Sequence, residues 1–125
     1  MTEMALEGIR VVDFGQAAVG AMLSRFLADF GAEVIKVETG KRIEIARRLE
    51  PFKDDIRDVD NSVPFAYINQ NKLSVTLDIK RPEGLELARK LVSVSDVVVE
   101  NFTVGVASRL QMSYEDLVKV KPDII

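Results

Sequence analysis

The chain has 125 residues, of which 47% are hydrophobic and 30% charged, and its formal net charge is -3. This length and composition suit one compact domain with a single core, and the small negative charge argues against a nucleic-acid-binding protein. The sequence contains no cysteine and no histidine. Disulfides, Cys or His zinc sites and histidine-dependent nucleophiles are therefore excluded.

The first residues, MTEMALEG, lack the basic and apolar regions of a secretory signal. No apolar run approaches the roughly 18 residues of a membrane span. We therefore expect a cytoplasmic protein that binds no membrane, no nucleic acid and no metal.

The first 38 residues follow the pattern of a βαβ unit. Residues 9–14 (IRVVDF) form a β-branched run bounded by glycines, which is typical of a buried parallel strand. Residues 18–30 repeat apolar side chains at three- and four-residue steps and end before Gly31, which predicts a helix. Residues 32–38 (AEVIKVE) alternate apolar and charged side chains, as a second strand does.

The middle of the chain is less regular. Residues 41–49 (KRIEIARRL) predict a short basic helix with a solvated face, and residues 54–64 predict an acidic loop. Asn69, Asn71 and Lys72 form a polar cluster, which we interpret as a turn in which Asn tolerates unusual backbone angles.

Regular patterns return in the second half. Residues 73–79 (LSVTLDI) have the period of a strand, Pro82 stands near the start of a helical pattern, and residues 96–100 (DVVVE) read as a fourth buried strand. A short helical segment follows at residues 103–110. Ser113 is then the expected N-cap of a last helix that ends at Pro122, and residues 123–125 resemble the start of a fifth strand.

The alternation of strands and helices predicts an α/β fold, a parallel sheet with helices on both faces and a ligand crevice at the carboxyl ends of the strands. Because the chain stops inside the expected fifth strand, we interpret residues 1–125 as one domain truncated at its carboxyl end.

The turn GQAAVG, residues 15–20, lies at that edge of the sheet. It has glycines only at its ends, so it lacks the G-x-G-x-x-G pattern of a dinucleotide site, and the Gly-Lys-Ser or Gly-Lys-Thr ending of a P-loop is missing. Glu38 nevertheless ends the second strand about as far downstream of the turn in the sequence as the acid that binds a ribose hydroxyl in dinucleotide sites. A plain turn with a solvated strand end is the alternative. Amides at the start of the helix favour an anion, and Gln16 offers a neutral donor and acceptor for an acyl carbonyl.

Several phrases in series resemble one protein family. LEGIRVVDF, LADFGAEVIKVE, NQNKLSVTLDIKRPEG, SDVVVENF and YEDLVKVKPDII are similar, in order and spacing, to the amino-terminal portion of class III CoA-transferases. This family includes formyl-CoA transferase, carnitine CoA-transferase and α-methylacyl-CoA racemase. The resemblance implies a Rossmann-like CoA-binding domain within a longer chain whose subunits interlock as a homodimer.

The resemblance also nominates residues that bind CoA. These lie in the turn after the first strand, in the third strand, and after the fourth strand: Gln16, Ala17, Ala18, Leu77, Asn101, Phe102, Arg109 and Leu110. Leu77, Phe102 and Leu110 would flank the adenine, Arg109 would pair with a phosphate, and the turn amides would meet the pantetheine or pyrophosphate.

The activity that the resemblance implies is the transfer of CoA from a CoA thioester to a free carboxylate, through an aspartate nucleophile beyond residue 125. This chain would then hold no catalytic residue except Gln16 as an auxiliary, and alone it would be inactive. An acyl-CoA racemase, a non-catalytic CoA- or nucleotide-binding module and half of an NAD-dependent oxidoreductase are the alternatives. Three departures from the family pattern stand out. Gly20 and Ala21 replace a Gly-Pro pair, and Thr39 and Leu73 replace basic residues, which weakens two expected contacts.

Overall fold

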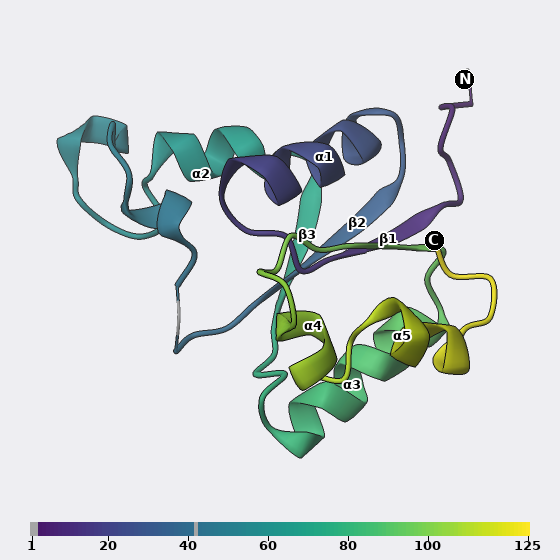
Figure 1. Cartoon of the computed structure of the whole chain (residues 1–125). Helices are drawn as coiled ribbons and strands as arrows, with labels where there is room; N and C mark the ends of the chain where they lie inside the picture. Colours follow the sequence, from purple (N-terminus) through teal and green to yellow (C-terminus); the bar gives the residue numbers. More distant parts are fainter. Residues whose placement is uncertain (1–2, 42) are drawn as a thin grey trace.

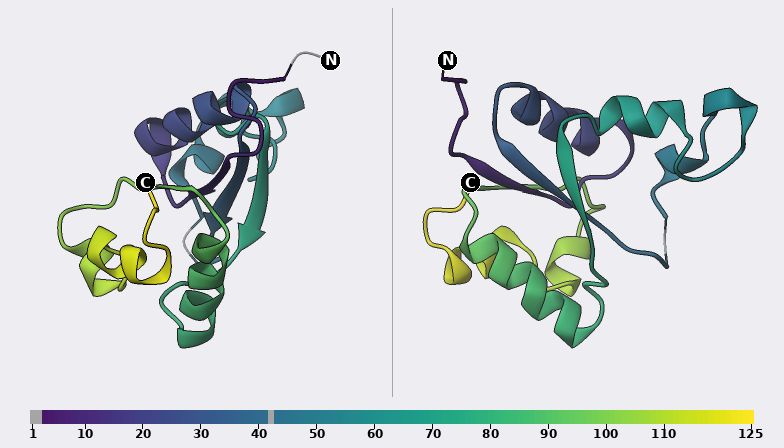
Figure 2. Two further views of the ribbon diagram at one scale, coloured as in Figure 1. Left: turned by 90° about the vertical axis from the view of Figure 1, so that its right-hand side faces the viewer. Right: turned by 180° about the vertical axis from the view of Figure 1, so that it is seen from behind.

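The computed structural model describes residues 3–41 and 43–125 (Figure 1). Four parallel strands form one sheet in the order β3-β2-β1-β4. These strands are β1 (Arg10–Asp13), β2 (Glu33–Glu38), β3 (Lys72–Thr76) and β4 (Val97–Val99). Helices cover both faces of the sheet (Figures 1 and 2), so the predicted α/β class is confirmed.

The two sides of β1 organise two hydrophobic clusters. Val11 and Val12 are both fully buried, and neighbouring residues of a strand point to opposite faces of the sheet. Val11 packs with Ala28 on the side of α1 (Ala17–Asp29). Val12 packs with residues of α3 (Pro82–Ser93) and α5 (Tyr114–Val120) on the other side, among them Ala88, Val92 and Leu117. The continuous apolar run of the central strand follows from this double burial.

Helix α1 approaches the sheet through small residues. Its buried positions are Gly20, Ala21, Ser24 and Ala28, whereas Leu23 and Phe26 of the same helix, and Phe30 directly after it, remain about half exposed. The helical period was therefore predicted correctly, but the face that packs is the one with the small side chains. A small face lets the helix axis come close to the strands, and this closeness shapes the turn that precedes the helix.

The middle segment differs most from the sequence expectation. Of the basic helix predicted at residues 41–49, a single 3-10 turn forms, η1 (Ile45–Arg48), and residue 42 lies outside the described residues. The prediction that this segment presents a solvated face is wrong for Glu44 and Ala46, which are only 3% and 2% exposed. A second 3-10 turn, η2 (Lys53–Asp55), overlaps the start of the loop predicted at residues 54–64. Helix α2 (Val63–Ile68) begins inside that loop, and its N-cap Ser62 accepts a hydrogen bond from the Phe65 amide.

The carboxyl-terminal half follows its predicted pattern closely. Pro82 is the first residue of α3, and Ser113 caps α5 in a capping box with Asp116. The short helical segment is α4 (Val106–Arg109). Residues 123–125 form no strand, but Ile125 donates to the Asp96 carbonyl at 3.1 Å and accepts from the Val98 amide at 2.9 Å. Within the residues that the structure describes, no helix combines the length and apolar character needed to cross a bilayer.

Candidate functional site

The turn between β1 and α1 is held by side chains along its whole backbone. The Gly15 amide donates to Asp13 Oδ1 at 2.7 Å, and the Ala17 amide donates to Glu44 Oε1 at 2.9 Å. The amide of Gln16 donates to Asn101 Oδ1 at 2.8 Å, and its carbonyl accepts from Asn101 Nδ2 at 2.9 Å. The three amides that would cradle a phosphate are thus already engaged, two of them by carboxylates. The arrangement argues against phosphate binding at residues 15–17 and leaves the Gln16 side chain as the exposed group of the turn.

The two glycines of GQAAVG pack against each other. A Cβ on Gly20 would lie 2.6 Å from the Gly15 Cα and 2.9 Å from Asn101 Oδ1. Both distances are shorter than a carbon can tolerate, so these glycines serve the close approach of the turn, the helix and Asn101. The spacing that fails as a dinucleotide fingerprint therefore has a packing explanation.

Replacing Gly20 with alanine is expected to destabilise the protein by about 1–3 kcal/mol, the usual cost of overpacking. The better helix propensity of alanine, worth up to about 1 kcal/mol, offsets only part of that cost. Gly40→Ala is the matched control, because a Cβ there meets no atom within 4 Å. Urea denaturation of both variants checks the prediction, and equal midpoints would contradict it.

A buried ionic cluster supports the same turn from below. Asp13 is fully buried and accepts from Ser24 Oγ at 2.6 Å and from Lys72 Nζ at 3.0 Å. Lys36, 2% exposed, donates to the Gly15 carbonyl at 2.7 Å and lies 3.1 Å from Glu44 Oε2. Burial lowers the pKa of the Lys72 ammonium, and the neighbouring Asp13 opposes that shift. The two carboxylates and two ammonium groups compensate one another, since all four side chains are at most 2% exposed.

A cleft of about 710 Å³ lies beside the turn, at the carboxyl ends of the strands. Its apolar lining comes from the ends of β1 and β2, from the segment after β3, and from the segment between β4 and the residue after α4: Phe14, Val37, Leu77, Ile79, Phe102, Val106 and Leu110. Gln16 reaches it from the turn. The strand order of the sheet explains why the cleft lies here. After β3 at one edge, the chain crosses over to β4 on the far side of β1, and ligand clefts form where the strand order reverses in this way.

The mouth of the cleft carries the charges. Lys41 pairs with Asp78 at 3.0 Å, and this contact holds the pKa of the Asp78 carboxyl below its ordinary value. Within the described residues, neither Lys80 nor Arg109 has an ion-pair partner, and both line the cleft. An apolar floor with cations at the opening suits a ligand that is part apolar and part anionic.

Glu38 also lines the cleft, but its carboxylate is already bound. Arg47 donates from Nε and Nη2 to its two oxygens, at 2.9 Å and 3.0 Å, and this bidentate contact raises the pKa of Arg47. A ribose hydroxyl would have to compete with a charge-assisted pair for this acid. The dinucleotide interpretation thus loses the residue that favoured it.

Five of the eight nominated residues line this one cleft, namely Gln16, Leu77, Phe102, Arg109 and Leu110. Leu77 was expected to lie in the third strand, but it lies directly after β3. Ala17, Ala18 and Asn101 are outside the lining, and Asn101 binds the Gln16 backbone through both its side-chain oxygen and nitrogen. The sequence reasoning missed Phe14, Val37, Lys41, Val106 and residues 78–81. Residues 78 and 79 were predicted to lie inside the third strand, but β3 ends at Thr76, so all of residues 78–81 follow the strand.

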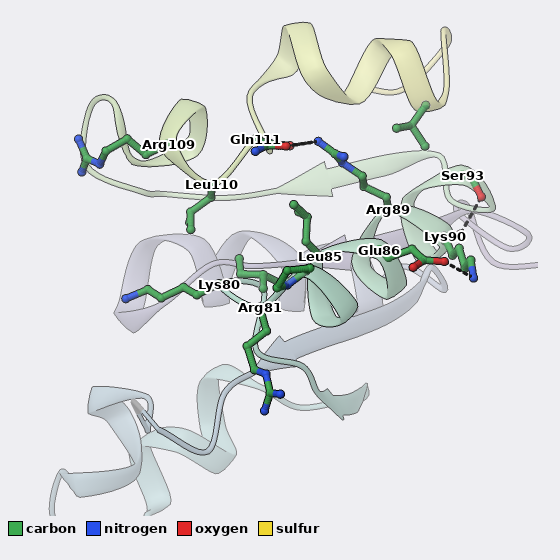
Figure 3. A pocket seen from close by; sticks show the side chains of 13 residues that line it. Lys80, Arg81, Leu85, Glu86, Arg89, Lys90, Ser93, Arg109, Leu110 and Gln111 are labelled. Carbon is green, nitrogen blue, oxygen red and sulfur yellow. Dashed lines mark hydrogen bonds and ion pairs between the residues drawn. The ribbon is translucent and has the colours of Figure 1, made fainter.

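A second hollow, about 780 Å³, runs along α3 (Figure 3). It shares five lining residues with the cleft, namely Ile79, Lys80, Arg81, Arg109 and Leu110. Figure 3 shows Arg109 and Lys80 at one end of it and Lys90 and Ser93 at the other. Lys90 pairs with Glu86 at 2.7 Å, and Arg89 donates to the Gln111 carbonyl at 3.0 Å. Both cations are therefore already bound within the chain.

The fold and the cleft define a parallel α/β domain of the kind that binds nucleotide-like ligands at its strand ends. Residues 6–125 match the model of CoA-transferase family III, and the chain belongs to this family. It is 41% identical over 123 residues to a formyl-CoA:oxalate CoA-transferase from Afipia carboxidovorans, covering 97% of this chain and 28% of that protein. The chain therefore spans less than a third of the length of such relatives.

Solved structures agree with this assignment. A CAIB/BAIF family protein from Brucella suis superposes with a TM-score of 0.87 at 33% identity, over 99% of this chain and 32% of that one. A dehydrogenase/reductase from Sinorhizobium meliloti has a TM-score of 0.53 at 15% identity, covering 98% of this chain and 52% of that one. The second similarity shows a shared fold alone.

Proposed function

We propose that this chain is the CoA-binding part of an enzyme that moves CoA from a CoA thioester to a free carboxylate. The observation that carries the proposal is the single cleft lined by Gln16, Leu77, Phe102, Arg109 and Leu110. Its apolar walls suit the adenine ring and pantetheine arm, and the cations at its mouth suit the phosphates. Membership of the family supports the same ligand.

Calorimetric titration of the full-length protein with CoA tests the binding part of this proposal. We expect saturable binding of CoA and no heat with NAD at the same concentrations, since Glu38 is held by Arg47. Absence of CoA binding, or binding of NAD with equal affinity, would refute the assignment.

The chemistry of transfer needs a nucleophile, and we place it outside this chain, on an aspartate after residue 125. Its carboxylate would attack the thioester carbonyl, release the CoA thiolate and form a mixed acyl anhydride. The thiolate would then attack the aspartyl carbonyl of that anhydride, which expels the donor carboxylate and leaves an enzyme-bound CoA thioester. The acceptor carboxylate would repeat the two steps in reverse, displacing the thiolate to form a second anhydride, and the thiolate would attack its acceptor carbonyl to give the new CoA thioester and the free aspartate. The role of this chain would be to hold the nucleotide end of CoA, with the side-chain amide of Gln16 close to the acyl carbonyl. Intact-mass spectrometry after incubation with a CoA thioester should detect the covalent adduct.

Formyl-CoA and oxalate are the first substrates to assay, since they are named for the relative that is 41% identical. A racemase of the same family would instead exchange the proton at the α-carbon of an acyl-CoA, so deuterium incorporation from heavy water distinguishes the two activities. The proposal includes a cytoplasmic homodimer, and sedimentation equilibrium of the full-length protein tests the dimer.

A further inference from the structure

Glu44 does not line the cleft, yet it contacts the turn that carries Gln16. Its side chain is 2% exposed, and Oε1 accepts the Ala17 amide hydrogen bond at 2.9 Å. Oε2 lies 3.1 Å from Lys36 Nζ, which in turn donates to the Gly15 carbonyl at 2.7 Å. Glu44 therefore acts on both neighbours of Gln16, directly on one side and through Lys36 on the other.

We infer that Glu44 is a positioning residue, which holds the turn between β1 and α1 so that the Gln16 side chain faces the cleft. The catalytic consequence of this inference rests on the proposed function, in which Gln16 meets the acyl carbonyl. The structural part, the hold on the turn, stands on the contacts of Glu44 alone.

The turn needs stabilising contacts because the backbone conformation of Ala17 is energetically unfavourable. Ala17 has a φ of 53°, in the left-handed region, where the Cβ of an L residue crowds the backbone. A hydrogen bond from its amide to a carboxylate is about twice as strong as one between neutral groups. Since Glu44 is 27 residues away in the sequence, the conformation of the turn depends on the middle segment as well as on its local contacts.

The middle segment itself is anchored at a second point of the site. Arg47, three residues after Glu44, binds both oxygens of Glu38 and lies over the Phe65 ring at 3.6 Å from its centroid. Ser62 Oγ donates to the Ala46 carbonyl at 2.6 Å. One 3-10 turn thus connects the end of β2 with the turn after β1, and it gives Glu44 a rigid base from which to act.

Amide hydrogen exchange of the full-length protein, followed by mass spectrometry, tests the hold directly. In Glu44→Ala we expect residues 15–17 to exchange about tenfold faster, as the loss of a hydrogen bond predicts, with exchange in β3 and β4 unchanged. Glu44→Gln keeps one acceptor oxygen and should give a smaller increase. Glu50→Gln, an exposed acid of the same segment, is the control and should behave as the wild type.

Unchanged exchange of the turn in Glu44→Ala, or an equal increase in every strand, would overturn the inference. If Glu44→Ala yields no folded protein, Glu44→Gln decides by the same criterion. In an active enzyme, Glu44→Ala should lower kcat about tenfold and change the KM for the CoA thioester less than about twofold, and an unchanged kcat would refute the catalytic consequence. If the wild type neither binds nor transfers CoA, the proposed function fails, while the exchange result still decides the role of Glu44.

Discussion

Replacing Asp13 with alanine is expected to lower the free energy of unfolding by about 3–5 kcal/mol, the cost of leaving buried charges without a partner. Asp13 is fully buried, receives the Lys72 ammonium at 3.0 Å and lies 3.9 Å from that of Lys36. It also accepts the Gly15 amide and the Ser24 hydroxyl. Its loss would leave two buried lysines with less compensation and free the start of the turn.

Urea denaturation measures this effect, and Asp60→Ala provides the control. Asp60, like Asp13, forms an ion pair, with Arg47 at 2.8 Å, but the Asp60 side chain is 81% exposed. Removal of the Asp60 carboxylate should therefore cost no more than about 1 kcal/mol. Asp13→Asn keeps the shape and one acceptor and should fall between the two. A similar small loss in Asp13→Ala and Asp60→Ala would show that the buried cluster contributes little.

Replacing Arg109 with alanine is expected to weaken CoA binding about ten- to a hundredfold, the range for a lost hydrogen bond to a charged group. Arg109 is the last residue of α4 and lines the cleft at its cationic mouth. The effect should shrink as salt is added, because salt screens exposed charges. Arg109→Lys should recover only part of the affinity, since a lysine lacks the planar fork of donors.

Calorimetry of the full-length protein measures this dissociation constant. Arg48→Ala is the control, because Arg48 is an exposed arginine of η1 and does not line the cleft. An unchanged affinity in Arg109→Ala would remove this residue from the CoA site.

The regular elements could be predicted from sequence because their signals are local. The β-branched runs of β1 and β2, the apolar period of α1, and the helix-start residues Pro82 of α3 and Ser113 of α5 all lie within or directly beside the elements that they define. Helix α2 was missed, although Ser62 followed by Pro64 is a recognisable helix start. The acidic composition before it dominated the interpretation.

The contacts that shape the site are non-local, and their partners cannot be read from the neighbouring residues. Asn101 was nominated as a ligand contact, but it binds the backbone of Gln16, 85 residues away. Glu44 looked like a solvated charge in a basic segment, yet it is buried against Ala17 and Lys36. Polar side chains at these positions have the same local pattern whether they face solvent, ligand or a distant turn. Asn71 is the counterexample, because its φ of 62° agrees with the turn predicted from residue type alone.

A crystal structure of the full-length protein with CoA would test the central claim most directly. The account predicts that the adenine lies between Leu77, Phe102 and Leu110, with a phosphate near Arg109 and the thiol end directed past Gln16. Density for CoA at any other surface, with this cleft empty, would contradict it.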